Sequence, residues 1–132
     1  MNQELVEKVL GKKNLRGADL REVEIFSTNL SNVDLQNANL SRANLYNTSF
    51  RNANLRNVNL SSANLTCTNL QMTDLRNANL RNANLFKADL CGANLLGADL
   101  KDAWLSGAKM DKETICKAKL TREQRKSINV IG

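Results

Sequence analysis

The feature that most constrains this chain is a five-residue repeat that runs through most of its length. Every fifth residue between positions 15 and 120 is large and apolar, and 18 of these 22 residues are Leu. Two places earlier in each unit, all 19 residues between positions 18 and 108 are Ala, Val or Thr. The residue between them is Asn or Asp in 16 of the 18 units between positions 14 and 99. The repeating unit is therefore A-(N/D)-L-x-x.

A period of five excludes an amphipathic α-helix. Five residues turn a helix by about 500°, so successive leucines would point to every side of it. A strand accommodates the pattern, because residues two apart point to the same face and the residue between them points to the other. Each unit then forms a short in-out-in strand and a two-residue corner. One such strand buries nothing by itself, so the chain must coil and stack its strands in parallel.

A weaker echo at 20 residues indicates how many units complete a coil. The residue after the large apolar position is aromatic at Phe26, Tyr46 and Phe86, which are 20 or 40 residues apart. Four units per coil give a coil with four sides. The parallel-crossover rule favours a right-handed wind. We therefore predict an all-β solenoid over residues 13–112, a right-handed quadrilateral β-helix of about five coils with short helical caps at its ends.

The tandem units, such as Ala38-Asn39-Leu40 and Ala83-Asn84-Leu85, resemble those of the pentapeptide-repeat family. The resemblance covers about residues 13–110. It implies a right-handed quadrilateral β-helix without catalytic residues, in a family that is especially numerous in cyanobacteria. The best understood activity in the family is DNA mimicry that protects type II topoisomerase from quinolones. Those relatives are acidic, whereas this chain has a net charge of +6, so we do not expect that role here.

Both ends of a solenoid must be covered. Residues 1–12 are expected to form an N-terminal capping helix that begins near Asn2 and stops at Gly11. Residues 113–132 are expected to contain a degenerate repeat, a C-terminal capping helix and a tail. The capping-box sequence that begins at Thr121 predicts a helix up to about Ile128. The apolar residues from Ile128 to Ile131 either fold back on the last coil or contact a second chain, so the protein is expected to be a monomer or an end-to-end dimer.

The composition argues against an enzyme. The chain has no His, the commonest general base and metal ligand, and no general base is expected near any Ser, Thr or Cys. We therefore expect no catalytic, metal or cofactor site. The three cysteines, Cys67, Cys91 and Cys116, are an odd number without C-x-x-C spacing, which favours a reducing compartment. With no signal-peptide pattern and no membrane-length apolar run, we expect a cytoplasmic protein that does not bind membranes.

Two groups of outward residues are candidate surfaces. The candidate protein-contact face, called the aromatic face below, contains four aromatic side chains predicted on one side: Phe26, Tyr46, Phe86 and Trp104. Exposed apolar patches often mark contacts, although neighbouring side chains also shelter such rings. The second group, called the basic face, lies on two other sides and consists of Arg16, Arg56, Arg76, Arg21, Arg81 and Lys101.

The basic face has two interpretations. Its cations would suit phosphates, but acidic residues lie among them and no aromatic residues are interleaved, so solvated surface residues are the better interpretation and we expect no nucleic-acid partner. The sequence thus favours a non-catalytic module that presents a rigid face to a protein partner of unknown identity. A DNA-mimic protein that binds topoisomerase and a weak nucleic-acid binder are the alternatives.

Overall fold

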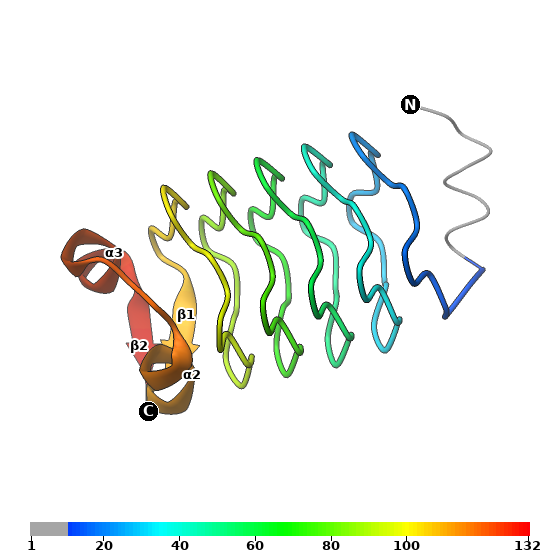
Figure 1. Ribbon diagram of the computed structural model, residues 1–132. Coiled ribbons are helices and arrows are strands. Elements are labelled where there is room, and N and C mark those ends of the chain that lie inside the picture. The colour runs from blue at the N-terminus through cyan, green and yellow to red at the C-terminus, as the bar shows by residue number, and fades with distance from the viewer. Residues whose placement is uncertain (1–10) are drawn as a thin grey trace.

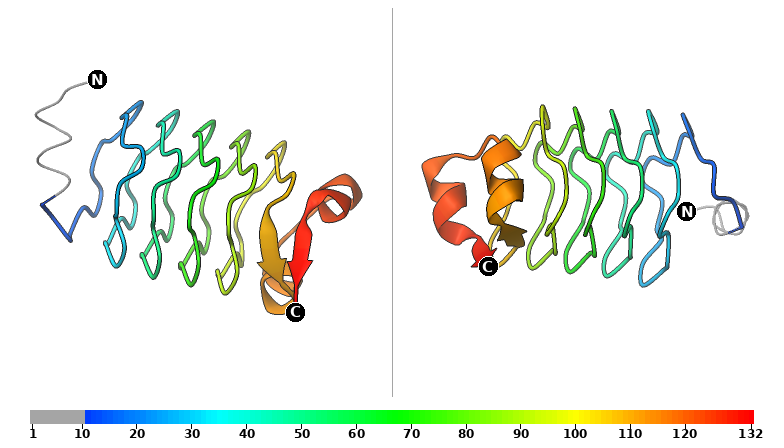
Figure 2. Two further views of the ribbon diagram at one scale, coloured as in Figure 1. Left: turned by 180° about the vertical axis from the view of Figure 1, so that it is seen from behind. Right: turned by 90° about the horizontal axis from the view of Figure 1, so that it is seen from below.

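The structure is a computed structural model that describes residues 11–132. From residue 11 the chain winds into stacked coils that form a rod, and the C-terminal helices and strands cover one end of it (Figures 1 and 2). Sixteen isolated parallel bridges join the coils of this described part, and each joins residues 20 apart, from Asn14↔Asp34 to Asp89↔Lys109. Four units therefore complete a coil, as the 20-residue echo predicts. The right-handed wind stays a prediction.

The core of the rod is a stack of leucines along its axis. Each large apolar residue between positions 15 and 110 is at most 7% exposed. All small positions between 33 and 108 are buried beside them, because four walls converge there and leave no room for larger side chains. Where the small residue is Thr, its hydroxyl donates to a backbone carbonyl, as Thr68 does to Leu65 at 2.7 Å and Thr73 to Leu70 at 2.8 Å. The hydroxyls of these threonines are therefore satisfied within the rod.

The corners have one repeated backbone conformation. The second corner residue has a positive φ in every unit between positions 17 and 107: 15 of these residues are not glycine, and four are Gly17, Gly92, Gly97 and Gly107. A positive φ at the third residue of a four-residue turn is typical of type II turns. Seven of the 15 are Asn, which tolerates this conformation better than most L-residues. Asn and Gly are therefore frequent here because of the backbone.

The outward Asn and Asp residues of the strands hold the corners. In all 16 units, the side-chain oxygen accepts a hydrogen bond from the backbone N–H two residues later. Asn59 does so from Ser61 at 3.0 Å, and Asp99 from Lys101 at 3.0 Å. This is the Asx turn, for which short carboxylate and amide side chains are suited. The regular recurrence of Asn and Asp along the chain therefore has a local cause, the Asx turn. The alternation of inward and outward residues in a strand does not by itself require Asn or Asp.

The C-terminal cap consists of four short elements. These are β1 (Lys109–Asp111), α2 (Lys112–Lys117), α3 (Arg122–Ser127) and β2 (Asn129–Ile131). A helix, α3, lies where the C-terminal helix was predicted, with Thr121 as N-cap and a complete capping box with Gln124. Where we expected a degenerate repeat from residue 113, the chain forms α2 instead. The carboxylate of Asp111 caps this helix by accepting from the Thr114 N–H at 2.8 Å.

The last strand returns to the ladder of the rod. β2 pairs in parallel with β1, and Lys109 lies opposite Asn129, so the 20-residue interval holds across the two helices. Ile128 packs against the core, whereas Val130 and Ile131 are 50% and 43% exposed. The fold-back of this segment onto the last coil therefore partly buries Ile128 but leaves the two apolar side chains of β2 exposed.

The capping helix expected over residues 1–12 lies almost wholly outside the described residues. Between residues 11 and 132, no helix has the length and apolar character needed to cross a bilayer.

Candidate interaction surfaces

The first half of the aromatic face is exposed. Phe26 and Tyr46 occupy equivalent corners of neighbouring coils, since the Ser27 N–H donates to the Tyr46 carbonyl at 2.8 Å. Their side chains are 55% and 45% exposed. Thr66 takes the same corner in the next coil. The two rings therefore form an exposed aromatic pair near the N-terminal end of one side.

The second half of the face lies nearer the C-terminal cap. Phe86 is half-buried, and the ammonium of Lys87 lies 5.2 Å from the centre of its ring, which is cation–π distance. Trp104 is bridged to Asn84 in the coil below, so it is on the same side, and it is 61% exposed. A shallow cavity of about 250 Å³ adjoins Trp104, between the last coil and α3. All four predicted aromatic residues thus share one side of the rod.

Two other large apolar side chains of the coils are exposed singly. Met72 and Leu96 are 57% and 58% exposed, which is as much as Phe26. They occupy corners on two other sides of the coil. Scattered exposed apolar residues are ordinary on protein surfaces, so these two serve as matched controls for the aromatic face.

Most residues of the basic face form ion pairs. Four of its six members have a carboxylate partner at a distance of 4 Å or less: Arg16–Asp34 at 3.7 Å, Arg21–Asp19 at 2.8 Å, Arg76–Asp74 at 2.6 Å and Arg81–Asp99 at 3.3 Å. The hydrogen bonds from Arg76 hold the pKa of Asp74 below its ordinary value, despite partial burial. Within residues 11–132, Arg56 and Lys101 make no ion pair within this distance, and the Nε of Arg56 is shielded without a hydrogen-bond partner. Paired side chains of this kind suit a solvated surface better than a phosphate track.

The thiols show no sign of activation. All three cysteines are unpaired; Cys67 and Cys91 are half-buried and Cys116 is exposed. Burial, together with the nearby carboxylate of Asp89, raises the pKa of the Cys91 thiol to about 11. A thiol with this pKa stays protonated at neutral pH and is a poor nucleophile. In the described part of the chain, no group of three or more His, Cys, Asp or Glu residues is placed to hold a metal ion.

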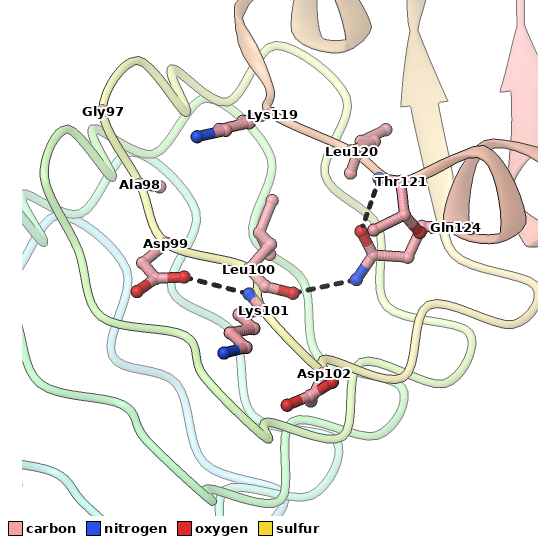
Figure 3. A pocket seen from close by; sticks show the side chains of 10 residues that line it. All are labelled: Gly97, Ala98, Asp99, Leu100, Lys101, Asp102, Lys119, Leu120, Thr121 and Gln124. Atoms are coloured by element: carbon pink, nitrogen blue, oxygen red, sulfur yellow. Dashed lines mark hydrogen bonds between the residues drawn. The ribbon is translucent and has the colours of Figure 1, made fainter.

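A groove at the C-terminal end was missed by the sequence interpretation. It has a volume of about 590 Å³ and lies between the last coil and the segment that joins α2 to α3 (Figure 3). Ten residues line it: Gly97, Ala98, Asp99, Leu100, Lys101, Asp102, Lys119, Leu120, Thr121 and Gln124. The sequence carries no signal for it, because Lys replaces Asn at position 119 but also at position 109, where the coil keeps its bridge to Asp89.

Solved structures of similar fold come from a plant and from cyanobacteria. A pentapeptide repeat protein of the Arabidopsis thaliana thylakoid lumen is 27% identical, with a TM-score of 0.73 over 84% of this chain and 74% of that one. HetL from Nostoc sp. strain PCC 7120, a pentapeptide repeat protein involved in heterocyst differentiation regulation, is 28% identical, with a TM-score of 0.54 over 74% of this chain and 59% of HetL. QnrB1, a plasmid-mediated fluoroquinolone resistance protein, shares the fold at 21% identity and a TM-score of 0.57, over 89% of this chain and 58% of QnrB1.

The comparison with curated protein sequences found no match. The family of pentapeptide repeats matches this chain in 8 copies, over residues 10–42, 43–82, 73–111 and 83–122. These segments cover the whole rod and α2. The 20-residue bridges, the leucine axis and this match agree, and the chain belongs to the pentapeptide-repeat family.

Proposed function

We propose that the protein is a non-catalytic interaction module that presents the aromatic face to a protein partner. The observation that carries this proposal is the exposure of Phe26, Tyr46 and Trp104, at 45–61%, on a single side of the rod. Aromatic side chains are enriched among the residues that dominate binding energy at protein interfaces. Met72 and Leu96 are equally exposed but lie on two other sides of the rod.

The rigidity of the rod supports the same role. Corresponding corners of neighbouring coils are about 4.8 Å apart along the axis, and backbone hydrogen bonds between coils hold this spacing. A partner surface would therefore meet Phe26, Tyr46 and Phe86 at fixed positions, with little loss of conformational entropy on binding. This pre-organisation favours recognition by shape.

The charge and the thiols support the other parts of the proposal. A net charge of +6 with ion-paired arginines argues against mimicry of DNA and against a nucleic-acid partner. The protonated thiol of Cys91 and the lack of His argue against covalent catalysis. The three unpaired cysteines suit a reducing compartment, so we place the protein in the cytoplasm.

The test compares two variants in lysate of the source cells. The first changes Phe26, Tyr46 and Phe86 to Ser, and the matched control changes Met72 and Leu96 to Ser. We expect the triple variant to lose the co-purifying partner and the control to retain it. A photo-crosslinking residue at position 46 should then join the same partner, whereas one at position 72 should not.

Two results would contradict the proposal. One is equal recovery of the partner by a folded triple variant, as judged from its circular dichroism spectrum. The other is loss of the partner from the control variant alone, which would move the contact to another side of the rod.

A further inference from the structure

The backbone pairing between coils follows a fixed rule on each side. On the side that contains Ala78, two N–H groups and one carbonyl pair with the next coil. The Leu80 N–H donates to the backbone carbonyl of Asp99 at 2.8 Å, and the Asn82 N–H donates to the backbone carbonyl of Lys101 at 3.0 Å. The Ala78 carbonyl accepts from the backbone N–H of Asp99 at 2.9 Å. The coil below repeats these three bonds from equivalent residues.

On the last coil the same three groups are open. They are the N–H groups of Leu100 and Asp102 and the carbonyl of Ala98, and nothing within residues 11–132 forms a hydrogen bond with them. On the adjacent sides at this end, side chains satisfy the equivalent carbonyls: Thr114 donates to Ala93 at 3.3 Å and Gln124 to Ala103 at 3.2 Å. The segment Ala98–Asp102 is thus an unpaired strand edge, whereas on each adjacent side a side chain of the cap satisfies the carbonyl.

The chain's own residues at the expected register stand away from this edge. Lys119 and Thr121 lie across the groove from Asp99–Asp102 (Figure 3). The capping box holds them there, because the Thr121 N–H donates to the side chain of Gln124 at 3.0 Å and the Thr121 hydroxyl accepts from the Gln124 N–H at 3.1 Å. The backbone of Lys119–Thr121, which would pair with this edge in a regular coil, therefore leads into the capping box of α3 instead. What remains is a groove of about 590 Å³ with an open strand edge along its floor.

We propose that this groove binds an extended segment of a partner polypeptide, which adds to the rod as a parallel strand along Ala98–Asp102. The site is distinct from the aromatic face and does not depend on it. Strand addition is the binding mode that suits an open edge, because main-chain hydrogen bonds supply the affinity. The backbone N–H of one partner residue would donate to the Ala98 carbonyl, and the carbonyl of the same residue would accept from the Leu100 N–H. The carbonyl of the residue two places later would accept from the Asp102 N–H.

The repeat also defines the side chains of the bound segment. Its inward residue would stack above Leu100 on the leucine axis, so a large apolar side chain is expected there. The outward residue before it would lie above the carboxylate of Asp99, which disfavours an acidic residue at that position. Asp99 already pairs with Arg81 at 3.3 Å, so no second cation is required. The preferred segment thus has a polar, uncharged residue above Asp99 and Leu at the following position, above Leu100.

The test uses the acetylated and amidated hexapeptide Asn-Val-Asn-Leu-Ser-Ser, which is the sequence of residues 57–62. It is added to the ¹⁵N-labelled full chain, and backbone amide resonances are followed by NMR. We expect saturable shifts of the Leu100 and Asp102 amides at peptide concentrations up to about 2 mM, and slower hydrogen exchange at both. The amides of Leu80 and Asn82, already bonded inside the rod, should not change.

Three matched controls separate strand addition from general contact. The same peptide with an N-methyl group on its second Asn lacks the donor to Ala98, and we expect its affinity to fall at least about tenfold. Lys119→Trp puts a bulky ring into the groove and should abolish the shifts. Lys112→Trp adds the same ring at an exposed site on α2 outside the groove and should leave them unchanged.

Several outcomes would overturn the proposal. The first is that neither the Leu100 amide nor the Asp102 amide shifts at about 2 mM peptide. The second is that the N-methylated peptide binds as tightly as the unmodified one. A third is slow exchange at Leu100 and Asp102 without peptide. If that protection is independent of protein concentration, the chain's own Lys119–Thr121 segment occupies the edge; if it rises with concentration, a second copy does.

Discussion

The coils between residues 13 and 110 and the cap between residues 111 and 132 satisfy the same backbone groups in different ways. In the coils, the carbonyl of each small residue between positions 18 and 88 accepts from a backbone N–H of the next coil, as the Thr73 carbonyl does from the Asn94 N–H at 2.9 Å. In the cap, residues at the same register use their side chains. Thr114 takes the place of a backbone donor to Ala93, and Gln124 does so for Ala103.

This difference shows how side chains can satisfy carbonyls of the last coil where no further coil follows. Asp111 accepts from the Gly92 N–H at 2.9 Å through its carboxylate, where a continuing coil would offer a carbonyl. The backbone returns at Ser127, whose carbonyl accepts from the Gly107 N–H at 2.9 Å, and at Asn129, whose N–H donates to the Ala108 carbonyl at 2.7 Å. The cap is therefore a coil of the usual length in which two helices replace strands. The side between them stays open, and an open edge invites pairing with another chain.

The largest expected effect comes from the leucine axis. Leu55 is fully buried, and Leu55→Ala should lower the free energy of unfolding by about 2–5 kcal/mol, since it leaves a cavity between coils. Leu120 belongs to the same five-residue series but is only half-buried in the cap, so Leu120→Ala should cost clearly less. Urea denaturation of both variants measures the difference. Equal losses would show that the cap and the coils share one core.

The next effect tests side-chain capping. Gln124→Glu keeps an oxygen for the Thr121 N–H but removes the donor to Leu100 and Ala103. A buried carboxylate would then face two carbonyl oxygens, and we expect a loss of about 1–3 kcal/mol, close to that of Gln124→Ala. Hydrogen exchange should quicken in α3 and remain slow in the coils. Wild-type stability of Gln124→Glu would reduce the role of Gln124 to the capping box.

The sequence was sufficient for the coil and insufficient for the cap, for physical reasons. Strict spacing of Leu and Ala predicts the axis, and aromatic residues 20 apart predict the coil length, because both follow from stacking. The capping box at Thr121 is a local signal, so α3 was predicted within a residue or two. In contrast, α2 depends on one carboxylate at Asp111, and the pairing of β2 depends on register across two helices.

The candidate surfaces were predictable in part for the same reason. Equivalent corners follow from the period, so the four aromatic residues were assigned to the right side. The exposure of each ring depends on neighbouring side chains, and Phe86 is half-buried beside Lys87. The groove could not be predicted, because it arises where Lys119–Thr121 leave the register of the coil.

A smaller effect concerns the corners. Asn59 accepts from the Ser61 N–H at 3.0 Å and from its hydroxyl at 2.7 Å. Asn59→Ala should cost about 0.5–1.5 kcal/mol, because the corner loses its acceptor. Asn59→Asp keeps the acceptor and should cost much less, as Asp occupies equivalent positions in other coils. If urea midpoints for the two variants coincide, the Asx turn contributes little and the coils rely on the leucine axis alone.

The smallest expected effect is a pH dependence of the cap. Hydrogen bonds from Thr114, and one from the Gly92 N–H, hold the pKa of Asp111 below its ordinary value of 3.8. Its ionised form therefore contributes stability that is fully present above about pH 3.8 and is lost as pH falls through the lower native pKa. Asp111→Asn keeps an oxygen for Thr114 but cannot titrate or accept from Gly92. Urea midpoints of the two proteins should differ at pH 5 and converge towards pH 2, whereas a constant gap would assign the capping to the neutral oxygen and leave the carboxylate without a role.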